Sequence, residues 1–161
     1  MLRLESIEEP VSKENLFIQK SIMNSDPFFN QIVVSKAYLN DEDIEKENKQ
    51  NLELGAKYFY IKQDDEPIGL IHFLPKNPYD NHTWIGLLII HKEYQRNGLG
   101  GYALRLLENK LKGQNIDKVR LCVQNGNDNG SAFWNKNGFT KISTSTDGHN
   151  NQIDIYEKIF V

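Results

Sequence analysis

A glycine-rich turn between an apolar run and a helix-like segment carries the clearest chemical pattern in this sequence. The run 84–90 is apolar almost throughout, which is typical of a strand buried on both faces. From 99 to 111, apolar residues recur with the spacing of one helix face. A glycine-rich turn at a helix N-terminus presents free N–H groups, and the helix dipole favours an anion there. We therefore predict phosphate or pyrophosphate binding at Gln95, Arg96, Asn97, Gly98, Leu99, Gly100 and Gly101.

Two common phosphate-binding motifs do not match this turn. A P-loop requires Lys and then Ser or Thr after its second glycine, but Gly100 is followed by Gly101 and Tyr102. A dinucleotide-binding fingerprint requires a third glycine three residues after the second and an acidic residue at the end of the next strand, and both are missing. The remaining pattern is Gln or Arg, two residues, Gly, one residue, then Gly or Ala, between a strand and a long helix.

The elements around the turn predict one α/β domain over residues 1–161 with a mixed, mostly antiparallel sheet. We expect about seven strands, at 2–7, 58–61, 68–74, 84–90, 118–123, 139–145 and 153–160. About four helices should flank them: one from Pro10 to just before Asp26, one over 28–39, one over 99–112, and a short one over 132–136 capped by Ser131. The intervening helix makes the strands at 84–90 and 118–123 parallel neighbours.

Composition narrows the class of protein. With 39% hydrophobic and 25% charged residues, the 161-residue chain is typical of a globular domain. Its net charge of -3 argues against bulk nucleic-acid binding. We find no apolar run long enough for a membrane span and no signal-peptide pattern, so we expect a cytoplasmic protein. The single cysteine, Cys122, lies in an apolar run and is expected to be a buried thiol.

A second motif lies in the segment 127–139. Asn127 stands seven residues before Trp134, and Asn135, Lys136, Asn137, Gly138 and Phe139 follow. This segment resembles the pattern Asn-x-x-Ala-x-x-Leu-Tyr-x-Lys-x-Gly-Phe of the GNAT superfamily of acetyl-CoA-dependent N-acetyltransferases. The glycine turn resembles that superfamily's pyrophosphate-binding signature at Gln95, Gly98 and Gly100. The two motifs at this spacing, with this order of elements, identify the chain as a member of the superfamily over essentially its whole length.

The resemblance implies acetyl-CoA as cosubstrate, no metal, and direct attack by an amine of a small molecule or peptide on the thioester. It also implies a V-shaped splay between the strands at 84–90 and 118–123. The pantetheine arm would lie along Leu88, Ile89 and Ile90, with an N–H near Leu88 facing the thioester carbonyl. Backbone N–H groups of residues 96–101 would hold the pyrophosphate, and Asn127 would bond the pantetheine arm. The Arg96 side chain either contacts a phosphate or is a solvated loop charge.

The catalytic groups are less well defined by the sequence. An amine is mostly protonated at neutral pH, so a base must take its proton, and the candidates are His72, Asp80, His82 and Glu93. The sequence does not distinguish among these four. Trp134 stands where the superfamily usually has a tyrosine proposed as general acid. An indole N–H donates a hydrogen bond but supplies no proton, so Trp134 is a donor near the sulfur, a pocket wall or core packing.

Two other functions remain open: a non-catalytic acyl-CoA-binding module or sensor, and a nucleotide-binding domain unrelated to CoA. The acceptor is not identified by any motif. The acidic stretch 40–51 fits a solvated helix or loop, or an acidic wall that attracts a cation. With Tyr38, Tyr79 and Trp84, such a wall would suit an aromatic, cation-attracting cleft. Apolar residues near the C-terminus are compatible with a homodimer: Ile153, Ile155, Ile159 and Phe160.

Overall fold

The computed structural model describes residues 1–148 and 150–160. The strands form one seven-stranded mixed sheet. The strands follow the spatial order β1-β2-β3-β4-β5-β7-β6, and only the β4–β5 pair is parallel among the strands described. Their bounds are β1 Leu2–Ser6, β2 Lys57–Gln63, β3 Glu66–Leu74, β4 Trp84–Ile90, β5 Lys118–Gln124, β6 Thr140–Thr146 and β7 Gln152–Ile159. The predicted fold class is confirmed.

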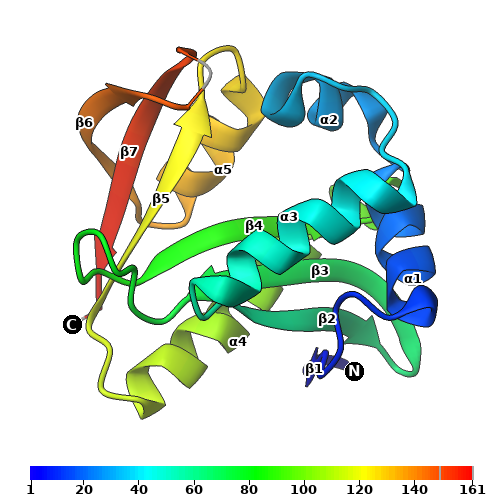
Figure 1. Cartoon of the computed structure of the whole chain (residues 1–161). Coiled ribbons are helices and arrows are strands. Elements are labelled where there is room, and N and C mark those ends of the chain that lie inside the picture. Colours follow the sequence, from blue (N-terminus) through cyan, green and yellow to red (C-terminus); the bar gives the residue numbers. More distant parts are fainter. Residues whose placement is uncertain (149, 161) are drawn as a thin grey trace.

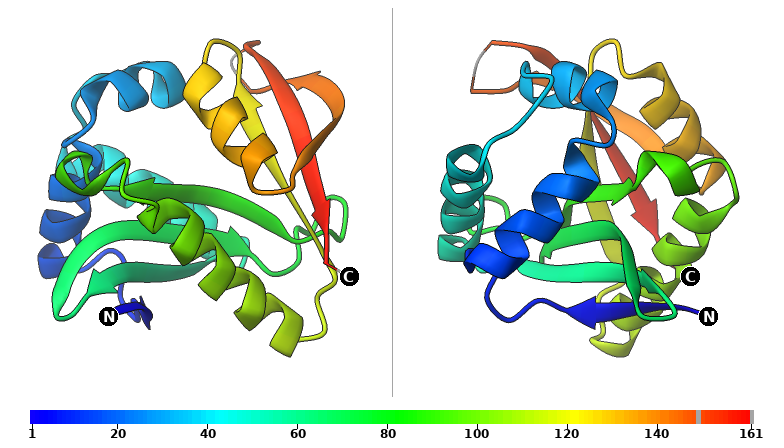
Figure 2. Two further views of the ribbon diagram at one scale, coloured as in Figure 1. Left: turned by 180° about the vertical axis from the view of Figure 1, so that it is seen from behind. Right: turned by 90° about the vertical axis from the view of Figure 1, so that its right-hand side faces the viewer.

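Helices cover both faces of the sheet (Figures 1 and 2). The N-terminal helices α1 (Lys13–Met23), α2 (Pro27–Val34) and α3 (Asp41–Glu53) lie on one side. The helices α4 (Leu99–Gly113) and α5 (Asp128–Lys136) lie on the other, and a short 3-10 turn, η1 (Lys92–Tyr94), follows β4. Within the described residues, no helix is both long enough and apolar enough to cross a membrane.

Capping residues set the helix boundaries. They correct two predictions, and for the acidic stretch they decide between the predicted helix and the predicted loop. Helix α1 begins at Lys13 rather than near Pro10, because the Ser12 hydroxyl caps it by accepting the Asn15 N–H. Helix α2 ends at Val34 rather than Leu39, because Ser35 adopts a left-handed φ of 60°. The acidic stretch is a helix, α3, which begins with a capping box between Asn40 and Asp43.

The core has two parts, one on each face of the sheet. On one face, Ala103, Leu104, Leu107 and Leu111 of α4 are fully buried against the strands, so the predicted helical stripe is confirmed with Leu104 as an additional member. On the other face, α1 and α3 contribute residues such as Leu16, Ile22 and Ile44 to a second cluster over β2, β3 and β4. Both faces of β4 are therefore covered, which holds it rigidly in the middle of the sheet.

The parallel pair β4–β5 is joined at one end only. Trp84 pairs with Arg120, and the Arg120 N–H donates to the Thr83 carbonyl at 2.9 Å. No further residue of β4 pairs with β5 within the described chain, although β4 pairs with β3 from Trp84 to Ile90 and β5 pairs with β7 from Lys118 to Gln124. The two strands therefore diverge toward their C-terminal ends, as Figure 1 shows. This divergence leaves one edge of β4 without a neighbouring strand among the residues described.

The C-terminal part of the sheet corrects two further predictions. Helix α5 is capped by Asn127, whose Oδ1 accepts the Gly130 N–H at 3.0 Å, and so begins four residues before the predicted start at Ala132, with Asn127 in place of the predicted cap Ser131. Cys122 is exposed rather than buried. It lies on the face of β5 opposite the buried residues Leu121 and Val123, and the helix α5 covers only their side.

Candidate functional site

The free edge of β4 presents backbone groups to the space between β4 and β5. The His91 N–H donates to the Ile68 carbonyl of β3 at 2.7 Å, which fixes the alternation of the antiparallel ladder. Because alternate residues face alternate neighbours, the N–H groups of Leu88 and Ile90 point toward β5. The carbonyl of Ile90 already accepts the Gln95 Nε2 at 2.8 Å. Gln95 therefore ties the end of β4 to the turn that follows it.

The glycine turn ends in a row of free donors. The Gln95 N–H donates to the Lys92 carbonyl, but none of the N–H groups from Arg96 to Gly101 donates to an acceptor in the described part of the chain. Left-handed backbone at Arg96 (φ 67°) and Gly98 (φ 74°) bends the turn. Six successive donors at a helix N-terminus form an anion cradle, and the helix dipole adds to it.

Two glycines of this turn also allow close packing of α4 against α5. A Cβ on Gly100 would lie 3.1 Å from the Phe133 ring, and one on Gly101 would lie 3.3 Å from the Asn137 Oδ1. The start of α4 therefore lies directly beside α5. The second sequence motif, which lies on α5, is brought next to the first by this contact.

Two exposed arginines stand at the cradle. The Arg105 Nη1 lies 3.6 Å from the position of a Cβ on Gly101, and its guanidinium lies over the Tyr102 ring. Arg96 lies within the turn itself. Neither takes part in an ion pair among the described residues. Arg105 was not predicted from the sequence, and its place on α4, one and a half turns after Gly100, is the signal that points to it.

The predicted residues of α5 have structural roles of their own. Asn127 uses its Oδ1 to cap the helix, which leaves its Nδ2 as the group that can reach a ligand. The Trp134 ring packs edge-on against Phe133 and Phe139, with centroid separations of 4.9 and 5.1 Å. Its Nε1 donates to no acceptor in the described chain, so the indole N–H is also available.

Three of the four predicted base candidates are outside the splay: two lie at its closed end, and one follows its open end but lines a different groove. Asp80 accepts the Trp84 Nε1 at 2.8 Å and the His82 N–H at 2.9 Å, which places both Asp80 and His82 at the closed end. Six extended residues separate His82 from Leu88, or about 20 Å. Glu93 lines a different groove, beside Phe17 of α1. The structure does not bring these residues to the free edge of β4.

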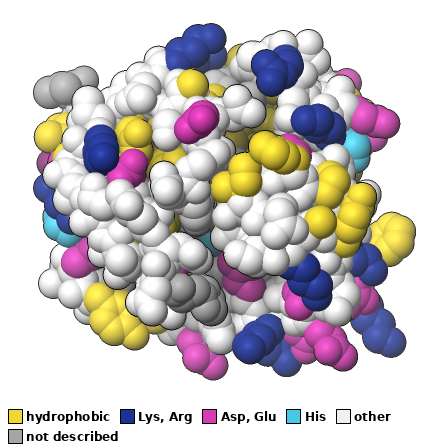
Figure 3. All heavy atoms as spheres, turned by 90° about the horizontal axis from the view of Figure 1, so that it is seen from above, with side chains coloured by type: hydrophobic (Ala, Val, Ile, Leu, Met, Phe, Trp, Pro, Cys, Tyr) yellow, Lys and Arg dark blue, Asp and Glu magenta, His cyan; other side chains and the backbone are white. Residues whose placement is uncertain are grey.

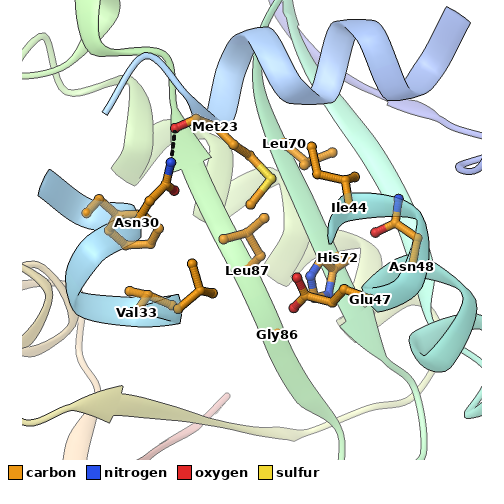
Figure 4. Close-up of a pocket in the computed structure, with 12 residues that line it drawn as sticks. Met23, Asn30, Val33, Ile44, Glu47, Asn48, Leu70, His72, Gly86 and Leu87 are labelled. Carbon is orange, nitrogen blue, oxygen red and sulfur yellow. Dashed lines mark hydrogen bonds between the residues drawn. The ribbon is translucent and has the colours of Figure 1, made fainter. Parts of the chain in front are cut away.

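The fourth candidate, His72, lies in a cavity of about 40 Å³ over β4 (Figure 4). Helices α1, α2 and α3 and strands β3 and β4 line it, and its walls are mostly apolar. Seen from above, the molecule is hollowed between α2 and the C-terminal strands (Figure 3). The polar groups in the lining are Asn30, Glu47, Asn48 and His72. Tyr38, Tyr79 and Trp84 are not among the residues that line it, so the predicted aromatic walls are wrong for this cavity.

A bulge in β4 lets the His72 ring lie over the strand. His72 is opposite Leu87, but Phe73 is opposite Ile85, so Gly86 is the extra residue. A Cβ on Gly86 would lie only 2.4 Å from the His72 Cε1 and 2.5 Å from the Nδ1. The Tyr58 ring lies against the other side of the His72 ring, with centroids 4.7 Å apart and the two planes tilted by 33°. Burial lowers the pKa of His72 to about 4, so the imidazole is neutral at physiological pH.

Glu47 was not singled out in the sequence, because it is one of several acids on α3. It lines the cavity from the side opposite β4 (Figure 4). The residue as a whole is exposed, but the protein packed around its carboxylate raises its pKa above the usual value. No group of three or more His, Cys, Asp and Glu residues that could hold a metal ion occurs in the described chain.

Comparisons with known proteins agree with this geometry. The sequence model of the acetyltransferase (GNAT) family matches residues 23–139. This range contains both sequence motifs, the free edge of β4, and the cavity at Glu47 and His72. A search of curated proteins found no match.

Solved structures with the same fold come from several acetyltransferases. One, an acetyltransferase from Thermus thermophilus, has a TM-score of 0.79 at 20% identity, over 99% of this chain and 97% of that one. Another, from Salmonella typhimurium, modifies the N-terminal serine of ribosomal protein L7/L12; its TM-score is 0.78 at 18% identity, over 99% and 95%. The spermidine N-acetyltransferase from Vibrio cholerae, solved with CoA and spermine, has a TM-score of 0.72 at 17% identity, over 98% and 95%.

Proposed function

The chain belongs to the acetyltransferase (GNAT) family, and from that premise we propose that it moves an acetyl group from acetyl-CoA to the amine of a small molecule or peptide. One observation carries the proposal: six free N–H groups of the turn 96–101 are continuous with the free edge of β4. A cofactor with a pyrophosphate at one end and an amide-containing arm at the other needs both features. We take residues 1–161 as a single domain.

The residues that would hold CoA follow from these free groups. The N–H groups from Arg96 to Gly101 would bind the pyrophosphate, with the Arg96 and Arg105 guanidinium groups beside it. The N–H groups of Leu88 and Ile90 would pair with the amides of the pantetheine arm, as in strand addition. The Asn127 Nδ2 would donate to the same arm. Ile89 faces β3 with its backbone, so its part is to hold the edge straight.

CoA supplies an activated acetyl thioester at the splay. The Leu88 N–H would donate to the thioester oxygen and stabilise the negative charge that develops there. A thiol has a pKa of about 8.5, so the sulfur can leave as a thiolate without a strong acid. We assign Trp134 to the wall beside the sulfur, where its indole N–H can donate. We give His82 and Glu93 no part in this arrangement, since His82 is held by Asp80 and Glu93 lines a different groove.

A charge placed in the cradle tests the cofactor site. Asn97→Asp changes one amide to a carboxylate within the row of free N–H groups and should weaken CoA binding about tenfold, measured by calorimetry. Asn109→Asp makes the same change on exposed α4, away from the turn, and serves as the matched control. Equal CoA affinity in both variants would refute the assignment of the pyrophosphate to this turn.

Turnover distinguishes the enzyme from the sensor. We expect release of CoA thiol from acetyl-CoA when a panel of primary amines is added. The alternative, a non-catalytic acyl-CoA-binding module, is favoured by the packing of Trp134 between two aromatic rings. Tight CoA binding without thiol release on any amine would favour that alternative over the enzyme.

A homodimer is a second proposal, on the uncovered face of the C-terminal strands. Ile153, Ile155 and Ile159 share that face with Cys122, and Ile159 is 60% exposed. Size-exclusion chromatography with light scattering measures the mass directly. A monomer at high concentration would contradict this proposal without affecting the acetyl transfer.

A further inference from the structure

The cavity over β4 contains hydrogen-bond acceptors that lack donors. Asn30 is only 1% exposed, and its Nδ2 already donates to the carbonyls of Met23 and Ala37 at 2.9 and 3.0 Å. Its Oδ1 is buried and has no partner among the described residues. Leaving a buried acceptor without a partner is unfavourable, so this oxygen calls for a donor from a ligand or a water.

The only charged side chain among the described residues that line the cavity is acidic. Among the described residues that line it, Glu47 is the only acidic side chain, and neither Lys nor Arg contributes. His72 is neutral and has no hydrogen-bond partner in the described chain for either ring nitrogen. The cavity therefore offers a carboxylate, an amide oxygen and an imidazole nitrogen to whatever enters. A donor-rich cation is the group that matches all three.

The size of the cavity and its position along β4 limit which ligands it can hold. A space of about 40 Å³ holds about three water-sized groups, since one water needs about 10–15 Å³ by the same measure. The walls beside Glu47 are apolar, formed by residues such as Met23, Val33, Ile44 and Leu87. Gly86 and Leu87 form the floor, one to two residues and about 3–7 Å along β4 from the Leu88 N–H. The cavity is therefore adjacent to the place proposed for the thioester.

We propose that this cavity is the acceptor site, that it takes the unbranched –CH₂–NH₃⁺ head of a primary alkylamine, and that Glu47 is its counter-ion and proton acceptor. This inference rests on the proposed acetyl transfer and names the acceptor class for it. An α-branched amine, such as most peptide N-termini, would place an extra carbon against the apolar walls. Lysine side chains and simple alkylamines have the required head.

The proton balance of the step is complete. The ammonium nitrogen gives one proton to the Glu47 carboxylate, and the electron pair set free forms the new C–N bond to the acetyl carbon. The C–S bond breaks and the sulfur leaves as a thiolate. The nitrogen then loses its second proton, which neutralises the thiolate, and Glu47 returns its proton to water.

The surroundings suit Glu47 to this task. Glu47 is exposed as a residue, but the protein packed around its carboxylate raises its pKa above the usual value, which makes the carboxylate a stronger base, and an arriving cation stabilises it. Of the described cavity groups that face it from α1, α2, β3 and β4, only His72 titrates. On β2, the Tyr58 hydroxyl is held by Asn48 and Asn51 and stays protonated, because burial raises its pKa further. On α3, Lys49 pairs with Glu45 at 2.7 Å.

Amine binding without CoA tests the inference independently of turnover. We expect n-butylammonium to bind the wild-type chain at pH 7.5 and tert-butylammonium, its branched isomer, to bind at least tenfold more weakly, by calorimetry. Glu47→Gln should weaken n-butylammonium binding about tenfold to a hundredfold, as expected for hydrogen bonds to charged groups. Glu53→Gln removes the same charge from a position on the same helix that does not line the cavity, and it should leave binding unchanged.

A spectroscopic readout covers the case of a poorly folded variant. In the wild-type chain, n-butylammonium should shift the imidazole resonances of His72 in NMR spectra, because the amine enters the cavity beside that ring. Binding without any change at His72 would overturn the inference. Equal affinity of Glu47→Gln and Glu53→Gln would also overturn it, as would a preference for the branched amine.

Turnover assays distinguish a failure of the role of Glu47 from a failure of acetyl transfer itself. For the wild type, kcat/KM should rise with pH through the raised pKa of Glu47, and Glu47→Gln should lose that acidic limb while its CoA affinity stays unchanged. Turnover with the same pH profile in Glu47→Gln would overturn the role of Glu47 but leave acetyl transfer intact. Absence of turnover on all amines, with n-butylammonium still bound, would instead refute the proposed function.

Discussion

Gly86→Ala is a sharp test of the structure around the cavity, because the new methyl group meets a single side chain. The Cβ would lie 2.4 Å from the His72 Cε1, whereas an ordinary contact begins at 3.4 Å, so the ring must move by about 1 Å (3.4 − 2.4). The backbone at Gly86 does not require glycine, because its φ lies outside the left-handed region. Any cost therefore comes from the ring, which the Tyr58 ring holds on its other side.

We expect Gly86→Ala to lower the free energy of unfolding by about 1–3 kcal/mol, the usual cost of overpacking a core. In a His72→Ala background the ring is gone, and the same substitution should cost less than about 0.5 kcal/mol. Urea unfolding, followed by circular dichroism in the four proteins of this double-mutant cycle, measures the difference. A similar cost in both backgrounds would show that His72 does not lie over Gly86 and would remove it from the acceptor cavity.

Three further predictions concern stability, pH and Trp134. The Lys158 Nζ lies 2.8 Å from the Oε2 of Glu108, which is only 6% exposed. Lys158→Met leaves that charge uncompensated and should lower the free energy of unfolding in urea by about 3 kcal/mol. Lys141→Met, at the more exposed pair with Asp154, should lower it by less than about 1 kcal/mol. Because the pKa of His72 is depressed to about 4 in the folded state, the unfolded chain binds the extra proton first. Between pH 6.5 and 4, the wild type should therefore lose about 3 kcal/mol more stability than His72→Gln, and parallel curves of unfolding free energy against pH would contradict this. Trp134→Phe keeps the aromatic packing and should retain turnover within about threefold, whereas a loss of about a hundredfold or more in kcat would give the indole N–H a direct part in catalysis.

Much of the proposed cofactor site could be predicted from the sequence, because its free N–H groups depend on local pattern. A strand, a glycine turn and a helix follow one another in the chain, so the cradle at 96–101 needs no distant contact. The left-handed φ of Gly98 and the contact of Gly100 with Phe133 give physical reasons for two of the glycines. Arg105 was missed because its approach to the turn depends on the helix that follows.

The acceptor side could not be predicted, because it depends on tertiary packing. Helix α3 carries acids around most of its circumference, and only its packing on β2 and β3 shows that Glu47 faces the cavity. The four base candidates differ by their distance from the free edge of β4, which the sequence does not contain. Cys122 was wrongly predicted as buried, because an apolar strand suggests cover on both faces and β5 has a helix over only one.

The most direct test of acetyl transfer is the intact mass of the protein and of the amine in the same reaction. With acetyl-CoA alone, the wild-type chain should gain no acetyl group, even though its one cysteine, Cys122, is exposed. When n-butylamine is added, N-butylacetamide and free CoA should appear in equal amounts, as direct attack on the thioester requires. A stable acetyl adduct on the protein that forms before the amide would contradict direct transfer, and no amide from any primary amine would contradict the transferase itself.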